Sequence, residues 1–367
     1  MKEKYDYLIV GAGLFGSVFA HEMTQLGKTC LVIDQREHTG GNIHNTIIDG
    51  IHVHQYGAHI FHTDNKSVWD YVNRFVTMNR FTNSPLARIG NELYNLPFNM
   101  NTFHQLWGVM TPAEARAKIE EQCGQYKDID PENLEQQALK LVGHDIYEKL
   151  IHHYTEKQWG RPCNTLPPFI IKRIPLRFTY DNNYFNDPYQ GIPIEGYNTL
   201  IDKLLKDCDI VLGEDYLTNR DSWNSKADKI LYTGCLDAYF NYCEGRLEYR
   251  SLRFETEHLE IADYQGNAVV NYTGADVPYT RIIEHKHFNF GSQPTTVITR
   301  EYPDTYQAGK VPYYPINDER NSTLYQKYAA MAAQQERLII GGRLAMYKYF
   351  DMDDTIAAAL TLAQQQR

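Results

Sequence analysis

The sequence predicts an α/β protein in which a Rossmann-like nucleotide-binding domain is interrupted by an inserted helical domain and by an antiparallel β-sheet domain. Three observations predict this fold: a strand, glycine-rich loop and helix at the N-terminus, helical periodicity over residues 67–160, and β-rich segments over residues 251–302. The chain has 367 residues, more than one hydrophobic core usually organises, so we expect two or three sub-domains.

The N-terminal segment has the pattern of a β-α-β unit. Residues 5–10 are an apolar run typical of a buried strand, residues 11–16 are rich in glycine, and a helix follows to about residue 26. Gly27 stands where a helix commonly ends, and residues 29–34 form the next apolar run. We therefore expect two neighbouring parallel strands at the start of the chain.

Further along, apolar side chains recur first at helical spacing and then in strand-like runs. Two groups each share one helical face: Val68, Tyr71, Val72, Phe75 and Val76, and later Leu134, Ala138, Leu141 and Val142. The β-rich runs, which Gly, Pro, Asn and Asp separate, are 252–255, 268–272, 279–288 and 295–301. This order predicts a helical domain and then an antiparallel sheet.

Two short apolar runs that end in glycine, 229–234 and 337–342, fit parallel strands that return to the N-terminal sheet, and a helix over 355–366 closes the chain. The nucleotide-binding domain is therefore predicted to be discontinuous. The expected boundaries are 1–66 with about 200–235 and 315–367 for this domain, about 67–160 for the helical domain, and about 161–199 with 236–314 for the antiparallel sheet that holds substrate.

Composition narrows the class of protein. A formal net charge of −10 argues against a general nucleic-acid binder, since phosphate backbones require basic surfaces. The apolar runs are far too short to span a bilayer, and a strand begins directly after Lys4, so we expect neither a membrane span nor a signal peptide. The six cysteines form no CxxC pair. These features predict a cytoplasmic protein with free thiols.

The glycine-rich loop carries the first chemical prediction. Gly11 permits a tight turn, Gly13 lets the backbone approach a pyrophosphate, and Gly16 lets helix and strand pack closely. The amides of Leu14 and Phe15 then face phosphate oxygens at the positive end of a helix. The loop therefore predicts a dinucleotide site.

Asp34 disfavours NADP at this site, and two further features favour FAD over NAD. Asp34 ends the second strand, where a carboxylate accepts a hydrogen bond from a ribose hydroxyl and repels the 2′-phosphate of NADP. The segment that includes Gly41 and Asn42 resembles the extended flavoprotein pattern, in which a second glycine pair follows the acidic residue. Near the C-terminus, the Gly-Gly pair before Arg343 resembles the flavoprotein element that holds the phosphate–ribityl region. The next helix would point its N-terminus, near Met352, at the flavin.

Distinctive segments in the middle of the chain identify a family. They are 56–63, 79–85, 154–160, 172–175, 181–185, 277–286 and 347–352. In unbroken order over essentially the whole chain, they closely resemble the bacterial UDP-galactopyranose mutases. The resemblance implies an isomerase that interconverts UDP-galactopyranose and UDP-galactofuranose for galactofuranose polysaccharide biosynthesis. N5 of reduced FAD would attack the anomeric carbon and expel UDP. A homodimer is expected by the same analogy.

The resemblance also assigns site residues. Three are implied to be catalytic: His59 against the flavin, with Ile60 beside it as a further cofactor contact, and Arg173 and Arg281 on the diphosphate. The other implied substrate contacts are Tyr184, Tyr314 and Tyr349 at the diphosphate or sugar, Asn83, Tyr154 and Thr155 at uridine, Trp159 near the sugar, and Asn271 and Asp351. One departure affects Tyr154, because His153 precedes it where the family has glycine.

Two other functions fit the cofactor domain. A flavin oxidoreductase of the amine-oxidase type would oxidise its substrate without needing uridine, and a nucleotide-sugar sensor would bind its ligand without turnover. The paired arginines favour the mutase over the oxidase, since amine substrates do not need them. Four histidines over residues 52–62 invite a metal interpretation, but Gly57 interrupts them and no Cys or carboxylate completes a known spacing. We predict no metal site.

Overall fold

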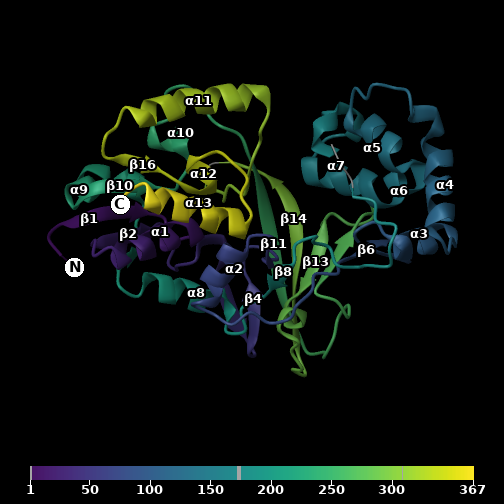
Figure 1. The fold of residues 1–367 in the computed structure, drawn as a ribbon, viewed down its shortest axis with the longest axis horizontal. Helices are drawn as coiled ribbons and strands as arrows, with labels where there is room; N and C mark the ends of the chain where they lie inside the picture. The colour runs from purple at the N-terminus through teal and green to yellow at the C-terminus, as the bar shows by residue number, and fades with distance from the viewer. Residues whose placement is uncertain (1, 172–174, 308) are drawn as a thin grey trace.

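The computed structural model describes residues 2–171, 175–307 and 309–367. A nucleotide-binding lobe and a helical lobe lie on either side of a long twisted sheet (Figure 1). Among the described residues, no helix has both the length and the apolar character that crossing a bilayer requires. The fold belongs to the predicted α/β class and contains the Rossmann-like domain.

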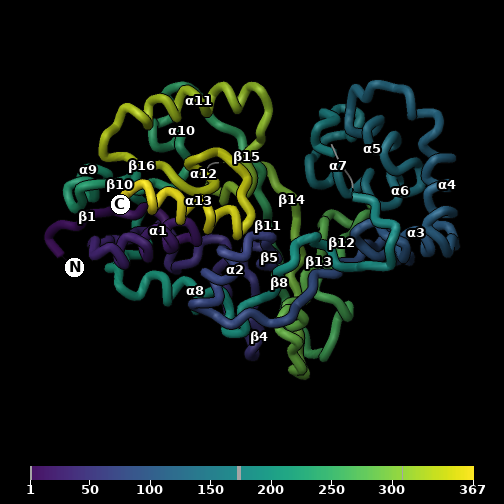
Figure 2. The backbone as a smooth tube through the Cα atoms, viewed as in Figure 1, coloured from purple at the N-terminus to yellow at the C-terminus, as the bar shows by residue number. Residues whose placement is uncertain are grey.

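The nucleotide-binding lobe is built on a five-stranded, fully parallel sheet. Its strands, in spatial order, are β16 (Leu338–Ile340), β10 (Ala227–Tyr232), β1 (Tyr5–Val10), β2 (Cys30–Asp34) and β9 (Asp209–Leu212). The chain leaves this lobe for the helical lobe after residue 73, comes back before β9 and β10, leaves again for the second sheet and comes back before β16 (Figure 2). The two returning strands that the sequence predicts, β10 and β16, therefore join the sheet beside β1. Because all five strands are parallel, the loops at their carboxyl ends meet at one edge.

Helices cover both faces of this sheet because its strands are apolar on both sides. On one face, Ile9 and Val32 pack with α1 (Leu14–Gln25), α2 (Lys66–Asn73), α8 (Gly196–Leu205) and α13 (Met352–Gln364). On the other, Leu8 and Leu31 pack with α9 (Arg220–Ser225), α10 (Leu236–Tyr239) and α12 (Gly342–Ala345). The remaining helix, α11 (Glu319–Ala333), packs against α10. The loops at the sheet edge thus rest on a rigid layer.

The second sheet has seven strands. In spatial order they are β15 (Tyr314–Pro315), β11 (Tyr249–Leu259), β14 (Thr296–Thr305), β13 (Arg281–Glu284), β12 (Val269–Tyr272), β6 (Leu86–Ile89) and β7 (Glu92–Asn95). All neighbours are antiparallel except β12 and β6. Two small ribbons pair β3 (Asn45–Ile48) with β4 (Ile51–His54), and β5 (Phe61–Thr63) with β8 (Tyr189–Gly191).

The helical lobe surrounds its own apolar core, which includes Phe103, Leu134 and Tyr147. Its helices are α3 (Met100–Trp107), α4 (Pro112–Cys123), α5 (Leu134–Val142), α6 (His144–Ile146), a π-helical turn (Tyr147–His152) and α7 (His153–Trp159). Short 3₁₀ turns follow at Cys163–Thr165 and Pro168–Ile171 and pack on the same core. The last helix of the series, α7, lies on the side of the lobe that faces the seven-stranded sheet (Figure 1).

The structure differs from the expected elements in two places. Helical structure was expected from residue 67 to 160, but α2 packs in the core of the nucleotide-binding lobe, and β6 and β7 extend the seven-stranded sheet. The expected strand 279–288 is shorter, because β13 ends at Glu284 and a 3₁₀ turn (His285–Asn289) follows. Local periodicity cannot report either difference, since the partner strands and the core that decide it are distant in sequence.

Candidate active site

The glycine loop has the close contacts that its motif predicts. Gly11 has φ +113°, and a Cβ there would lie 2.0 Å from Thr233 Oγ1. A Cβ at Gly16 would lie 2.1 Å from the carbonyl oxygen of Gly11, so only glycine lets α1 approach the loop this closely. Gly13 faces Gly41, because a Cβ added at Gly13 would lie 3.8 Å from the Gly41 Cα. The two glycine motifs therefore form one surface.

Asp34 stabilises the glycine loop through hydrogen bonds to backbone amides. Its Oδ2 accepts a hydrogen bond from the amide of Ala12 at 2.8 Å, and its Oδ1 accepts one from the amide of Arg36 at 2.9 Å. A carboxylate has about four lone-pair sites, so each oxygen keeps one for a further donor. Asp34 can therefore fix the turn and bind a hydroxyl at the same time.

Arg36, which the sequence analysis did not single out, supplies a cation at the edge where an anionic dinucleotide is expected. Its Nη2 donates to Asn42 Oδ1 at 2.9 Å, and its guanidinium lies 4.4 Å from the centroid of the Tyr56 ring. Its Nη1 is buried without a hydrogen-bond partner in the described structure. An unpaired buried guanidinium nitrogen is costly unless a ligand oxygen occupies the space beside it. The residues at this edge therefore fit FAD.

The C-terminal glycine element packs on the first helix. A Cβ at Gly341 would lie 2.2 Å from the Phe15 ring. Beyond it, Arg343 donates to the carbonyls of Phe350 at 2.6 Å and Tyr313 at 3.3 Å, which fixes the loop that leads to α13. Met352 is the first residue of α13, as the sequence predicts for a helix N-terminus at this edge.

His59 lies in a chain of histidine contacts. Its Nδ1 is 2.8 Å from the carbonyl oxygen of Gly57, and its backbone amide donates to Nδ1 of His54 at 3.1 Å. The amide of His54 donates in turn to Nδ1 of His285 at 3.2 Å, and Nε2 of His285 is 2.7 Å from Thr299 Oγ1. An imidazole nitrogen that accepts from an amide carries no proton, so these contacts require neutral His54 and His285.

Burial favours the same neutral forms. It lowers the pKa of His59 to about 4 and of His285 to about 3, and it places the pKa of His54 well below its usual range. In the unfolded chain a histidine has a pKa of about 6.5.

These shifts predict acid sensitivity. Stability from the three neutral histidines is fully present above about pH 6.5 and falls as the pH drops toward their folded pKa values, because only the unfolded chain binds the protons. Each group contributes up to about 1.4 kcal/mol per pH unit in that window. Urea unfolding between pH 8 and pH 4.5 measures the slope, and His285→Gln should reduce it. An unchanged slope in that variant would show that His285 is protonated in the folded protein.

The seven-stranded sheet brings together one row of polar side chains. Arg281 on β13 stands opposite Asn271 on β12 and opposite Glu301 on β14. Nε of Arg281 lies 3.1 Å from Oε1 of Glu301, at an angle too poor for a hydrogen bond. Oδ1 of Asn271 is buried without a partner in the described structure. These unsatisfied groups mark the row as a place for a polar ligand.

Arg281 and Glu301 share a recessed environment. Burial alone would lower the pKa of Arg281, but Glu301, Tyr154 and Tyr314 together outweigh it and the pKa rises. Burial raises the pKa of Glu301, which is 5% exposed, against the opposing effect of Arg281. The guanidinium therefore stays charged, with Nε beside the Glu301 carboxylate and Nη2 beside the Tyr154 hydroxyl.

Tyrosines surround this arginine. The hydroxyl of Tyr154 on α7 lies 3.3 Å from Nη2 of Arg281. The rings of Tyr314 and Tyr349 are 5.7 Å apart, and burial raises the pKa of Tyr314 to about 12. Tyr184 is half-exposed, and its amide donates to the carbonyl of Asn83 at 2.7 Å. Neutral phenols can donate to phosphate or sugar oxygens, so this lining fits an anionic sugar ligand.

The other predicted residues lie on α7, in an apolar cluster or at the start of α13, and one lies outside the described residues. Thr155 is buried on α7, and Trp159 ends that helix. Ile60 packs on the apolar cluster of Phe81 and Phe288, and Asp351 precedes α13 as its N-cap residue. Arg173 lies outside the described residues, so its role stays a prediction.

Two charged residues of the cleft were missed by sequence reasoning. Glu301 ends one of the β-rich runs, where nothing local distinguishes it from a surface carboxylate. Arg250 pairs with Tyr314 in the sheet, and its Nη2 donates to the carbonyl of Gln158 on α7 at 2.6 Å. Only the strand register, which single-sequence patterns do not give, could have found them.

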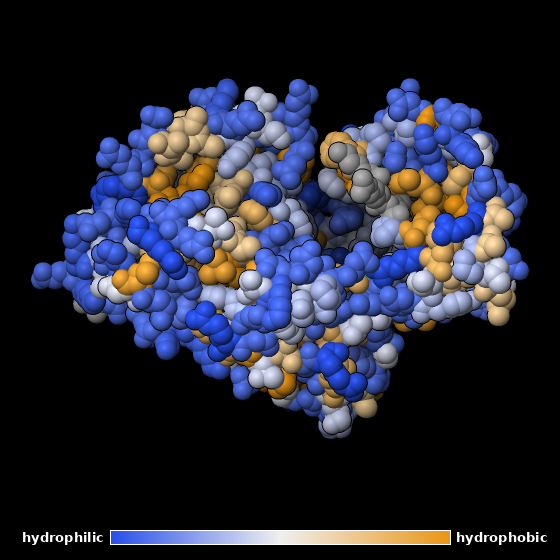
Figure 3. Space-filling model, in the orientation of Figure 1, coloured by the Kyte–Doolittle hydropathy of each residue, from blue (hydrophilic) through white to orange (hydrophobic). Residues whose placement is uncertain are grey.

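A depression lies between the two lobes (Figure 3). Strands β13 and β14 lie between the helical and nucleotide-binding lobes in Figure 1, and Figure 3 shows a depression there with hydrophilic side chains at its rim.

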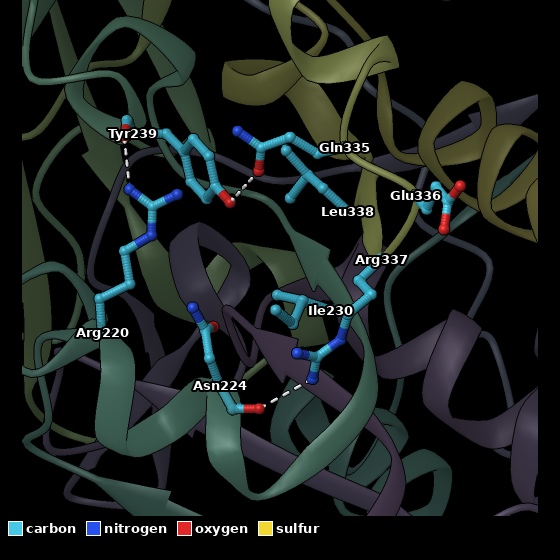
Figure 4. A pocket seen from close by; sticks show the side chains of 8 residues that line it. All are labelled: Arg220, Asn224, Ile230, Tyr239, Gln335, Glu336, Arg337 and Leu338. Carbon is cyan, nitrogen blue, oxygen red and sulfur yellow. Dashed lines mark hydrogen bonds between the residues drawn. The ribbon is translucent and has the colours of Figure 1, made fainter.

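A separate cavity of about 360 Å³ lies at the opposite, amino end of β10 and β16 (Figure 4). Its arginines, Arg220 and Arg337, donate to the backbone carbonyls of Tyr239 and Asn224. These bonds connect α9 to α10 and to the residue before β16, and give the cavity a structural role.

A histidine and glutamate cluster lies at the start of α7. His152 faces Glu148 at 3.1 Å through Nδ1 and Glu156 at 3.3 Å through Nε2, and His153 is 3.8 Å from Glu156. The two imidazole rings stack at 4.3 Å with an interplanar angle of 20°. The nitrogen lone pairs of stacked rings lie in separate, nearly parallel planes, which does not favour one shared ion. We interpret the cluster as a polar network between the imidazoles and the two carboxylates.

The fold and the cleft define an enzyme of the dinucleotide-binding α/β class. Residues 149–349 match the UDP-galactopyranose mutase family, and residues 9–75 match the NAD(P)-binding Rossmann-like domain. The chain is 40% identical over 366 residues to a probable UDP-galactopyranose mutase of Klebsiella pneumoniae, in an alignment that covers 98% of this chain and 94% of the relative. The chain therefore belongs to the UDP-galactopyranose mutase family, and it is an isomerase.

Two further comparisons frame this result. The chain is 36% identical over 366 residues to the dTDP-fucopyranose mutase of Escherichia coli, with 97% of each chain covered. The crystal structure of reduced UDP-galactopyranose mutase superposes with a TM-score of 0.74 over 99% of this chain and 95% of the other. Putrescine oxidase bound to putrescine gives 0.55 over 99% of each chain. At 12% identity, both structural matches show the fold alone.

Proposed function

We propose that this protein interconverts UDP-galactopyranose and UDP-galactofuranose and thereby supplies galactofuranose for polysaccharide synthesis. The observation that carries the proposal is Arg281, a recessed guanidinium held by Glu301 beside the Tyr154 hydroxyl. An acidic protein needs such a local cation to bind a diphosphate. The relative from Klebsiella pneumoniae supports the choice of substrate. By the same resemblance we propose a cytoplasmic homodimer.

The proposed cofactor is FAD in its reduced form. The residues that would hold it are the glycine loop, Asp34, Arg36, Asn42 and Arg343, with His59 and Ile60 on the flavin side. When bound, reduced FAD supplies the nucleophile, N5, that displaces UDP from the anomeric carbon.

The chain's own residues would handle the departing group. Arg281, together with Arg173, would bind the diphosphate as it gains charge, since a guanidinium presents paired donors to phosphate oxygens. Tyr184, Tyr314 and Tyr349 would donate to diphosphate or sugar oxygens.

The remaining predicted contacts would place uridine and the sugar. Asn83, Tyr154 and Thr155 would bind the nucleoside. Trp159 would lie near the sugar, and two polar residues, Asn271 and Asp351, would contact hydroxyls.

The relative from Escherichia coli supports a second substrate, dTDP-fucopyranose. The same cleft residues would bind its diphosphate, so the two substrates differ at the base, at the 2′ position of the pentose and at C6 of the hexose. We favour the uridine substrate because the identity to the Klebsiella relative is higher, 40% against 36%.

The assay that tests the proposal is chromatography of nucleotide sugars incubated with the purified protein. The protein should release FAD on denaturation and convert UDP-galactofuranose only after dithionite reduction, without consuming further reductant. Conversion of dTDP-fucofuranose alone would select the second substrate. Net oxidation of the substrate would indicate an oxidoreductase, and binding of UDP without turnover would indicate a sensor. Equal rates in oxidised and reduced protein would exclude N5 as nucleophile.

A further inference from the structure

Lys157, on α7, reaches across to the loop that joins β12 to β13. Its Nζ lies 2.7 Å from the carbonyl oxygen of Tyr272, 3.2 Å from that of Val277 and 3.0 Å from that of Tyr279. A lysine ammonium has three N–H donors, so these three carbonyls can take all of them. One side chain thus fixes the conformation of the loop and connects it to helix α7.

The contact between Lys157 and the β12–β13 loop joins the two elements that carry Tyr154 and Arg281. Tyr154 stands three residues before Lys157 on α7, so the two side chains share one face of the helix. The loop is flanked by Asn271 on β12 and by Arg281 at the start of β13. The contact of 3.3 Å between Tyr154 and Arg281 therefore depends on how α7 sits on the loop.

The surroundings of Lys157 are unusual for a lysine. The side chain is only partly exposed, and burial lowers its pKa to about 8, although Asp276 acts in the opposite direction. A buried ammonium is costly unless its donors are satisfied. Three backbone oxygens satisfy this one, and a neutral side chain of the same length would leave the loop without those donors.

We propose that Lys157 is a positioning residue that sets the spacing between α7 and β13, and so holds Tyr154 and Arg281 at the distance that the nucleotide diphosphate requires. The inference rests on the proposed function, because it assigns Lys157 to the same cleft. A displacement of about 1 Å can cost about a hundredfold in rate, so a residue that touches no substrate can still control turnover.

The test compares Lys157→Met with a matched control, Lys286→Met. Nζ of Lys286 also contacts three carbonyls, those of Ala262, Gln293 and Thr295, in loops away from the polar row. Both variants replace the ammonium with an unbranched neutral side chain that is one heavy atom shorter. For each, one measures flavin content, melting temperature, the dissociation constant of UDP by calorimetry, and kcat and KM for UDP-galactofuranose under dithionite.

We expect Lys157→Met to weaken UDP binding about tenfold and to lower kcat/KM by about ten- to a hundredfold, with flavin retained. Lys286→Met should lose stability but keep parental UDP affinity and kcat/KM. Lys157→Arg retains the charge and should lie between parent and Lys157→Met; if the methionine variant does not fold, the arginine variant takes its place. The proposal is overturned if the Lys157 variant that folds keeps parental UDP affinity and kcat/KM. It is also overturned if the losses in that variant are no larger than those in Lys286→Met.

Amide hydrogen exchange separates this proposal from the proposed function. Amides of residues 273–280 should exchange at least tenfold faster in Lys157→Met than in the parent, whether or not any nucleotide binds, because the loop loses its three bonds to α7. If the parent binds no UDP while this loop is loosened, the proposed function fails and the connection stands. If exchange in the loop is unchanged, Lys157 does not position it.

Discussion

Replacing Gly16 with alanine should abolish flavin retention and destabilise the protein. The added Cβ would lie 2.1 Å from the carbonyl oxygen of Gly11 and 3.1 Å from Ile9 Cγ2. The first contact is with backbone, which a rotamer change cannot relieve, so α1 must move away from the sheet. Overpacking of this kind costs about 1–3 kcal/mol, and the loop that binds the dinucleotide is distorted as well. Flavin absorbance per protein and the melting temperature measure both effects.

Two other glycines make the Gly16 experiment specific. Gly124 has a helical φ of −51°, and an added Cβ would meet nothing within 4 Å, so Gly124→Ala should keep flavin and stability. At Gly13 the nearest atom would be 3.8 Å away, which the fold tolerates. Gly13→Ala should therefore keep the apoprotein stable but lower FAD affinity, because the methyl group would meet the pyrophosphate. Full flavin content in Gly16→Ala would mean that the close packing of α1 is not required.

The N-terminal β-α-β unit could be predicted from the sequence because all its signals are local. β1 has the predicted bounds of residues 5–10, and β2 begins one residue after its predicted start. The structure adds that the two glycine motifs meet, since Gly13 faces Gly41. Strand, turn and helix patterns within about 35 residues specify this arrangement without reference to the rest of the chain.

The polar row could be predicted only in part. Arg281 belongs to a family motif, but its partner Glu301 is 20 positions away and becomes its neighbour only through the register of β13 and β14. The same holds for Lys157, whose carbonyl partners lie more than a hundred positions along the chain. The strands β6 and β7 are each four residues long and lie between helices, so their place in the sheet depends on β12 as a partner. Contacts of this kind require the tertiary structure.

The largest kinetic effect is expected for Arg281→Ala. In the proposed reaction, UDP gains negative charge as its bond to the anomeric carbon breaks, inside a chain with a net charge of −10. Without the guanidinium that charge is poorly stabilised, and comparable electrostatic contacts contribute about 3–4 kcal/mol, or roughly a hundred- to a thousandfold in kcat/KM. Arg281→Lys should recover part of the loss, because an ammonium does not reproduce the paired donors of the guanidinium.

A structural consequence must be separated from this kinetic one. Glu301 is 5% exposed, and removing its partner leaves a buried charge alone, a change that typically destabilises by about 3–5 kcal/mol. The double variant Arg281→Ala/Glu301→Gln removes that charge and should regain stability but not turnover. Arg253→Ala is the matched control, since Arg253 forms an exposed ion pair with Glu255 and should have parental kinetics.

The decisive measurement is steady-state kinetics of these variants on UDP-galactofuranose under dithionite, with flavin content and melting temperature determined for each. A loss in kcat would place Arg281 on the transition state, and a rise in KM alone would place it on bound substrate. If Arg281→Ala and its double variant both keep kcat/KM within threefold of Arg253→Ala, the diphosphate does not bind at this row. Arg281 would then have no part in turnover, and the diphosphate site would have to lie elsewhere in the cleft.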